Sequence, residues 1–269
     1  ADTLRRSRQP ASGILPKERK LLRIEKFETE DRMQSAAKID HPCSKCAFYT
    51  DSVWHPVDTG SIKSLAHNFV RRDLNEGEAL FEQGADNRGV FCISRGLIAL
   101  RTHHAEGNST LLRLAYPGEV VGFRSFLGDG QHQTEARALM PSRVCTVPHS
   151  ASKSLLRDNP AILGQLAARC VKEIDRTHAR ICSAATKTYK VQLADLLKTL
   201  LDHHGTQVGN EKLMRLPLSR TDLSDLLGVQ PETLSRLIKR LEKDGDFRVK
   251  GRHVTYNASA PKSARSAVS

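Results

Sequence analysis

The chain has 269 residues, a formal net charge of +12 at pH 7 and an isoelectric point of about 9.6. This length suffices for two domains, and the excess of basic residues favours a polyanionic partner. The sequence holds no apolar run near the ~20 residues that span a bilayer, and its arginine-rich start lacks the apolar core of a secretory signal. We therefore expect a cytoplasmic protein with no membrane segment.

Residues 1–40 are rich in charge and poor in aromatic side chains, so we expect a flexible basic segment there. The segment is followed by the first of six cysteines, which are Cys43, Cys46, Cys92, Cys145, Cys170 and Cys182. A chain of this length can bury a core without disulfides. Cysteines at special positions are therefore better interpreted as metal-binding or redox groups.

Residues 41–160 have the pattern of a β-rich domain. Four short runs rich in β-forming residues occupy positions 90–93, 97–100, 111–114 and 143–147, and glycines punctuate the segments between them. Many short strands with glycine turns predict a small antiparallel barrel or sandwich.

Residues 161–187 predict one long helix. Apolar or small residues recur at steps of three and four, at positions 162, 166, 167, 170, 171, 174 and 181. This stripe is longer than one small barrel needs, so we expect it to pair with a second copy of the chain in a homodimer. The alternative is a helix that packs only on its own barrel. A further helix is predicted at 191–203.

The most informative stretch lies within a C-terminal domain at 188–257. Ser219 can cap a first helix over Arg220–Leu227, and Gly228 suits a sharp turn that requires positive φ. Pro231 suits the first turn of a second helix. Residues 247–256 predict a hairpin, which would make this a winged helix-turn-helix, and 258–269 are expected to form a disordered tail.

The second helix of this pair has two distinct faces. The polar face, at i, i+3, i+4 and i+7, carries Glu232, Ser235, Arg236 and Lys239. The apolar face carries Leu234, Leu237, Ile238 and Leu241. The polar groups suit base edges and phosphates in a major groove, and Thr233 and Arg220 join them as candidate contacts to double-stranded DNA. The alternative, an ordinary solvated face, is less favoured by the helix–turn–helix spacing.

The order of barrel, long helix and winged helix resembles the superfamily of the cyclic-AMP receptor protein and the fumarate-nitrate reduction regulator (CRP/FNR). Segments 75–84, 117–123 and 229–237 carry the resemblance. It implies an α+β fold with an N-terminal antiparallel β-roll of the cyclic-nucleotide-binding type as sensor domain (41–160), a dimerisation helix (161–187) and a C-terminal winged helix-turn-helix. It also implies a transcription regulator, not an enzyme, that binds a palindromic DNA site as a homodimer and contacts RNA polymerase.

The nucleotide-binding branch of this family has Gly-Glu-Leu followed about ten residues later by Arg-Ser or Arg-Thr, whose cation meets the cyclic phosphate. Here Gly122 is followed by Phe123 in place of the glutamate. Gln133 stands where the arginine belongs, and Glu135 adds a repelling charge. The comparison therefore implies that no cyclic nucleotide binds.

The oxygen-sensing branch resembles this chain more closely. Its members hold a [4Fe-4S] cluster with cysteines spaced C-x2-C-x5-C and one distant cysteine in the barrel. Cys43 and Cys46 match the first pair, and Cys145 matches the distant ligand. Ser52 stands where the third cysteine belongs, so the ligand set is incomplete by one.

Two residues near the missing position carry donor atoms, and Asp51 or His55 is the candidate fourth ligand. Cluster binding is expected to order the segment around 43–55 and to adjust the long helix, which would bring two winged helices into register. In this branch the recognition motif at Glu232, Ser235 and Arg236 implies a TTGAT-type half-site, with Arg236 bonding to guanine.

Three other outcomes stay open for the first cysteines. Zinc is the alternative ion, because His41, Cys43, Cys46 and His55 offer four borderline-soft donors. Bare thiols, inert or redox-reactive, are a second alternative. A C-x2-C thiol oxidoreductase is the alternative from another class, although no thioredoxin-like βαβ pattern accompanies the pair.

The other three cysteines are interpreted as packing residues. Cys92 is a weaker candidate ligand than Asp51 or His55, because it shares a strand face with Val90 and is expected to be a buried small hydrophobe. Cys170 and Cys182 fall within the long helix and are also expected to pack.

Overall fold

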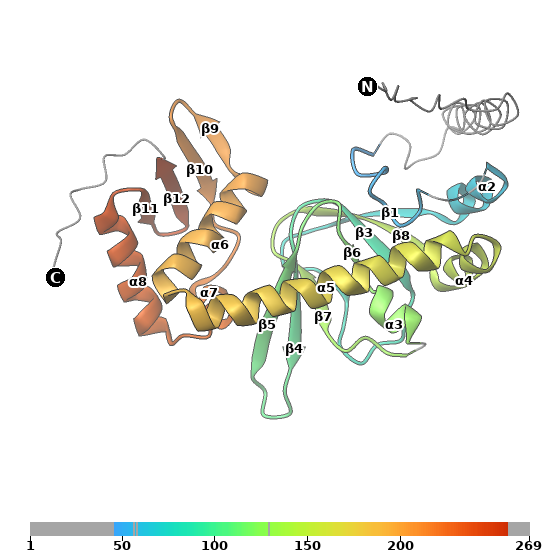
Figure 1. The fold of residues 1–269 in the computed structure, drawn as a ribbon, viewed down its shortest axis with the longest axis horizontal. Helices are drawn as coiled ribbons and strands as arrows, with labels where there is room; N and C mark the ends of the chain where they lie inside the picture. The colour runs from blue at the N-terminus through green and yellow to red at the C-terminus, as the bar shows by residue number, and fades with distance from the viewer. Residues whose placement is uncertain (1–45, 56, 58, 129, 258–269) are drawn as a thin grey trace, which may run out of the picture.

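The computed structural model describes residues 46–55, 57, 59–128 and 130–257. The segment 1–40, the tail 258–269, His41 and Cys43 lie outside the described residues, so the expectations for them stay predictions. The described chain passes from a small β-barrel along one long helix to a second, smaller domain (Figure 1). The predicted α+β fold class is confirmed.

Two four-stranded antiparallel sheets form the barrel. The first has the order β1 (Val70–Leu74), β8 (Ser142–Pro148), β3 (Gly89–Arg95) and β6 (Val120–Val121). The second has the order β2 (Ala79–Phe81), β7 (Glu135–Ala138), β4 (Ile98–His103) and β5 (Ser109–Ala115). Inward-facing residues of both sheets, among them Phe91, Ile93 and Ala136, form one core. The four predicted strand runs correspond to β3, β4, β5 and β8.

Gly122 shows why the barrel needs glycine where β6 gives way to helix α3 (Phe123–Leu127). Its φ is +80°, and a Cβ atom there would lie 2.6 Å from the Phe91 ring. Any larger residue would strain the backbone and displace a core aromatic side chain.

Helix α5 (Ala161–Thr186) has 26 residues and follows the shorter helices α2 (Thr59–Asn68) and α4 (His149–Asp158). Its first turns are buried, because Ile162 and Leu166 pack in a core with Trp54 and Leu155. Other large apolar residues of the helix are exposed, both in these first turns and farther along. They are Leu163, Val171, Ile174 and Ile181.

The C-terminal domain is the predicted winged helix-turn-helix. Its elements are α6 (Tyr189–His204), β9 (Thr206–Val208), β10 (Glu211–Arg215), α7 (Arg220–Leu227), α8 (Pro231–Asp244), β11 (Phe247–Lys250) and β12 (His253–Asn257). Ser219 and Asp222 form a capping box in which each backbone N–H donates to the other side chain, at 2.7 and 3.1 Å. Gly228 follows α7 with φ +66°, as its place in the turn predicts. The β9–β10 hairpin was not expected from the sequence.

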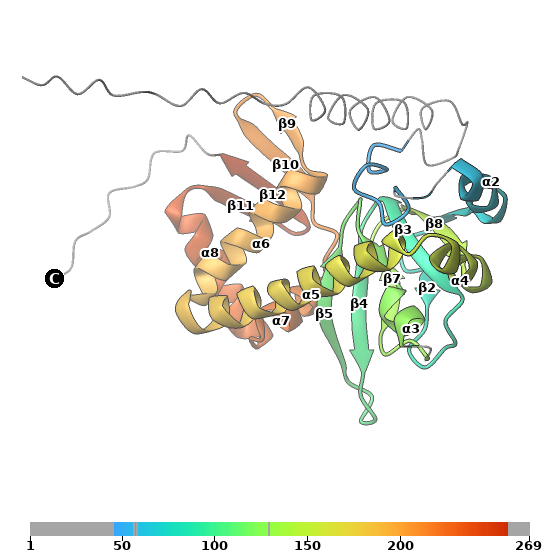
Figure 2. The same cartoon turned by 45° about the vertical axis from the view of Figure 1, so that its right-hand side comes forward.

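The winged domain rests on the barrel, and α5 runs alongside both (Figure 2). Leu97, Leu111 and Leu114 of the barrel share one hydrophobic core with Leu223 of α7. Arg180 of α5 donates to the carbonyl groups of Leu112 and Leu226, so the helix is tied to both domains. No helix within the described ranges is long and apolar enough to cross a membrane.

Candidate sensor cavity and DNA-reading helix

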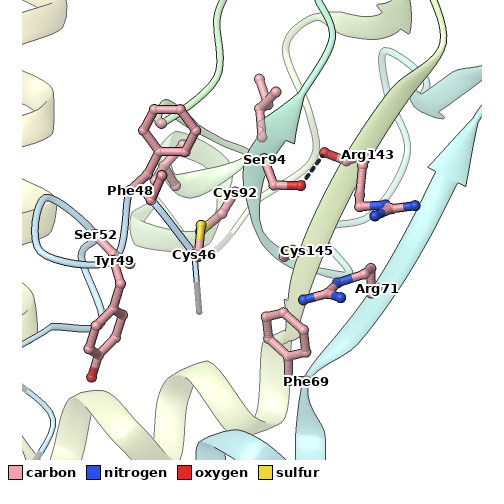
Figure 3. Close-up of a pocket in the computed structure, with 14 residues that line it drawn as sticks. Cys46, Phe48, Tyr49, Ser52, Phe69, Arg71, Cys92, Ser94, Arg143 and Cys145 are labelled. Atoms are coloured by element: carbon pink, nitrogen blue, oxygen red, sulfur yellow. Dashed lines mark hydrogen bonds between the residues drawn. The ribbon is translucent and has the colours of Figure 1, made fainter. Parts of the chain in front are cut away.

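A cavity of about 290 Å³ lies between the segment that starts at Cys46 and the outer face of the β1-β8-β3 sheet (Figure 3). Sulfur, aromatic and cationic side chains dominate its lining. The residues are Cys46, Ala47, Phe48, Tyr49, Ser52, Phe69, Arg71, Cys92, Ile93, Ser94, Gly118, Val120, Arg143 and Cys145.

Three of these residues form a row across the sheet. Cys145 on β8 lies opposite Cys92 on β3 and opposite Arg71 on β1. Residues directly opposite each other in antiparallel strands project from the same face. Phe91 and Val144, their neighbours in sequence, belong instead to the core between the sheets. The row therefore faces outward, toward the segment that carries Cys46.

Burial controls the ionisation of the two strand thiols. It raises the pKa of Cys92 to about 12. Burial also raises the pKa of Cys145, and a hydrogen bond from Arg71 offsets part of that increase. As free thiols both groups are protonated at neutral pH and are poor nucleophiles. This weighs against a thiol-exchange role for this pair, because such chemistry needs a thiolate.

Trp54 belongs to the hydrophobic core against which Cys92 packs and is a polar neighbour of its sulfur. Its indole Nε1 is buried and has no hydrogen-bond partner among the described residues. The same group lowers the pKa of Cys92, which is the effect of an N–H donor directed at the sulfur. A buried donor without a full hydrogen bond is costly, and a thiolate beside it would offer a better acceptor than a thiol.

The predicted metal ligands are brought together only in part. Cys46 and Cys145 line the cavity, whereas Cys43 lies outside the described residues. Asp51 and His55 are exposed and do not line it. The His55 ring contacts Tyr49 edge-on at 5.4 Å, and the Asp51 carbonyl accepts a hydrogen bond from Arg169 of α5.

The other cysteines differ from expectation in two places. Cys92 is half-buried and lines the cavity, in addition to packing against the core as expected. Cys170 also packs against that core, but Cys182 is exposed, so the expectation that it packs is wrong. In the part of the chain that the structure describes, no three His, Cys, Asp or Glu side chains are gathered tightly enough to hold one metal ion.

The barrel also contains the segment that aligns with the nucleotide-binding motif. Glu135 is buried and forms an ion pair with Arg137 at 2.6 Å, which holds the pKa of its carboxyl below the usual range. His132 is buried as well, stacked on Phe81 with ring centroids 3.7 Å apart. Gln133 stands at the position of the phosphate-binding arginine, and the nearby Arg137 is already paired with the Glu135 carboxylate.

The polar face predicted for the second helix of the helix-turn-helix is confirmed in α8. Glu232, Ser235, Arg236 and Lys239 are exposed, whereas Leu234, Leu237, Ile238 and Leu241 are buried. Arg220 is exposed at the first residue of α7, and Thr233 is half-buried. The Ser235 hydroxyl donates to the Pro231 carbonyl at 3.0 Å, which leaves its oxygen as an acceptor for a base or water.

Two family matches cover the described domains. Residues 71–159 match the cyclic nucleotide-binding domain, and residues 191–257 match the Crp-like helix-turn-helix domain. The chain is 26% identical to electron transport regulator A of Shewanella oneidensis over 228 residues, which are 84% of this chain and 91% of that protein. It is 27% identical to the fumarate and nitrate reduction regulatory protein of Vibrio cholerae over 225 residues, 83% of this chain and 89% of that protein.

Solved structures share the fold. The c-di-GMP-responsive global regulator CLP of Xanthomonas campestris superposes with a TM-score of 0.62 at 18% identity, over 75% of this chain and all of that one. FixK2 of Bradyrhizobium japonicum gives a TM-score of 0.60 at 21% identity, over 70% of this chain and 92% of that one. Structural similarity at these sequence identities establishes the fold. The signal that the protein senses must be inferred from its own residues.

Proposed function

Because the chain belongs to the CRP/FNR family of DNA-binding transcription regulators, we propose that it binds a palindromic TTGAT-like site as a homodimer and responds to oxygen or redox state through an iron–sulfur cluster. By the same resemblance, RNA polymerase is its expected protein partner. The observation that carries the proposal is the shared cavity of Cys46 and Cys145, the two described positions that correspond to ligands in the oxygen-sensing branch.

The residues around the cavity fit such a group. Cys46 and Cys145 offer soft thiolate donors, and Cys43 precedes them in sequence, outside the described residues. Arg71 places positive charge beside Cys145, where it would stabilise the thiolate form. A bound [4Fe-4S] cluster would supply soft iron that prefers thiolates and an oxygen-labile link between the loop and the barrel.

The cavity is connected to the long helix by direct contacts. Arg169 of α5 donates to the Asp51 carbonyl in the loop beside the cavity. Farther along, Glu119 of the barrel pairs with Arg176 of α5 at 2.6 Å, and Arg113 pairs with Glu173. A change in the order of the loop would therefore act on α5 near its first turns. This is the route by which we propose that the sensor biases the DNA-bound arrangement.

The proposed dimer rests on the uncovered stripe of α5. Leu163, Val171, Ile174 and Ile181 have exposed fractions of 49–62%, spread along a helix that extends past its own barrel. An exposed row of large apolar side chains at helical spacing is the signature of a helix–helix interface. A second copy packed there would place two α8 helices for successive turns of the major groove, about 34–36 Å apart.

The test is metal analysis coupled to DNA binding. Protein purified without oxygen should contain about four iron and four acid-labile sulfide atoms per chain and show a broad visible band that is lost in air. Fluorescence anisotropy on a TTGAT palindrome should then give weaker binding after exposure to air. Metal-free or zinc-only protein after anaerobic reconstitution would overturn the sensing proposal, as would equal DNA affinity with and without iron.

A further inference from the structure

We propose that Cys92 is the fourth thiolate ligand of this sensor, beside Cys43, Cys46 and Cys145, and replaces the cysteine that the N-terminal segment lacks. The inference rests on the proposed iron–sulfur function and assigns to it a ligand from the barrel. The sequence favoured Asp51 and His55, close to the gap in the cysteine spacing, and ranked Cys92 below them. The structure favours Cys92 instead, because it lines the cavity and they do not.

The first observation is the position of Cys92 in the sheet. It lies opposite Cys145 across the β3–β8 pair, and both side chains project from the outer face. Both line the cavity that Cys46 enters from the loop above (Figure 3). Three of the five cysteines in the described residues thus surround one space, although they come from three separate segments of the chain.

The second observation is the buried donor beside Cys92. The Nε1 atom of Trp54, a residue that is 1% exposed, has no hydrogen-bond partner of normal geometry among the described residues, and its effect on the pKa of Cys92 is that of a donor directed at this sulfur. An N–H group facing a ligating sulfur is a common means of stabilising the charge of such a site. If Cys92 were only a small hydrophobe, the indole would remain without a strong acceptor in a core where such groups are normally satisfied.

The alternative ligands lack these features. Asp51 and His55 are exposed and lie outside the cavity lining. A carboxylate is also a hard donor, whereas iron–sulfur iron prefers sulfur. A cubane cluster distributes its protein ligands over several irons, so three thiols can serve it without converging on one point.

The test compares Cys92→Val with Cys182→Val. Valine preserves an apolar, strand-forming side chain at position 92 but cannot ligate, and Cys182 is exposed on α5 and provides the matched control. Each full-length protein is reconstituted without oxygen, and iron, sulfide, the visible spectrum and the electron paramagnetic resonance signal are recorded. We expect Cys182→Val to match the wild type and Cys92→Val to retain its cluster at least about tenfold less well, since even outer-shell changes cost that much.

Thermal melts of the iron-free proteins establish that the variants fold, and Cys92→Ser serves as a second variant if valine disturbs the strand. A Cys92→Val protein with wild-type iron content and unchanged spectra would overturn the assignment of Cys92 and leave the sensing proposal intact. A Cys92–Cys145 disulfide in the anaerobic wild type would also overturn the assignment. Wild-type protein without iron would instead overturn the proposed function on which the assignment rests.

Discussion

Arg101 on strand β4 and Asp222 on helix α7 form an ion pair that joins the barrel to the helix-turn-helix. The two side chains are only 15% and 10% exposed, and a second carboxylate, Asp225, lies 3.6 Å from the same guanidinium. Asp222 also accepts the backbone N–H of Ser219 in the capping box of α7. One carboxylate therefore both caps α7, the first helix of the helix-turn-helix, and holds it against the barrel.

Replacing Arg101 by methionine is expected to destabilise this junction by about 1–3 kcal/mol. Asp222 would still accept the Ser219 N–H in the capping box, but its partly buried carboxylate would have lost the Arg101 guanidinium. Chemical denaturation measures the loss, and limited proteolysis between α5 and α7 should show a less protected link. Arg88→Met is the control, since Arg88 is an exposed barrel residue. Equal stability of the two variants would show that the ion pair contributes nothing to domain docking.

Local periodicity explains how much of the DNA-reading surface could be predicted. The two faces of α8 follow from the spacing of Arg236, Leu237 and their neighbours within one helix, and the turn follows from Gly228. The predicted assignment of these residues to DNA contacts stays a prediction, but the helix and its exposed face are as expected.

The set of residues that line the sensor cavity could not be predicted from local sequence patterns. Alternation placed Cys92 on the face of Val90, yet its neighbour across the sheet depends on the register between β3 and β8, which are far apart in sequence. The same holds for the pair of Arg101 and Asp222. The sequence therefore favoured Asp51 and His55, which are neighbours of Cys46 along the chain, and ranked Cys92 below them because its place across the sheet could not be predicted.

Arg236→Ala is expected to weaken binding to a TTGAT palindrome by about 1–3 kcal/mol and to relax the preference at one base position, since its exposed guanidinium can bond two guanine acceptors. Fluorescence anisotropy over a set of operators with single-base changes measures both effects. Lys239→Ala, on the same face one turn later, is the comparison. Lys239→Ala should weaken binding to all operators by the same factor and reduce the slope of log affinity against log salt concentration by about 0.9. A uniform loss with Arg236→Ala would make this residue a phosphate contact.

Ile174→Glu is expected to break the proposed dimer, because it puts a charge in the middle of the exposed apolar stripe of α5. Light scattering should report a mass near 29.9 kDa per particle in place of twice that value. DNA affinity should fall together with the mass, since one winged helix then reads one half-site. Lys172→Glu changes the charge of an exposed residue on the same helix and should remain dimeric. If the wild-type protein is monomeric at high concentration, the exposed apolar stripe of α5 does not form a dimer interface.

His132 gives the barrel a predictable response to acid. The ring is 3% exposed, its Nδ1 lies 2.9 Å from the Ser125 hydroxyl, and its Nε2 is buried without a partner among the described residues. Burial lowers the pKa of His132, so the folded protein keeps the ring neutral at a pH where the unfolded chain has begun to protonate it. The unfolded state then binds more protons, and stability must fall as the pH drops below the unfolded value of about 6.5.

We therefore expect the free energy of unfolding to decrease between about pH 7.5 and 5.5, and His132→Gln to flatten that decrease while lowering stability at neutral pH. Glutamine can still bond to Ser125 but does not titrate. The exposed His67 provides the control, and His67→Gln should retain the wild-type slope. His204, whose pKa is also lowered by burial, accounts for part of the slope that remains. Parallel pH curves for His132→Gln and the wild type would mean that the ring is not kept neutral by burial, and that the packing of the Phe81 stack tolerates its charge.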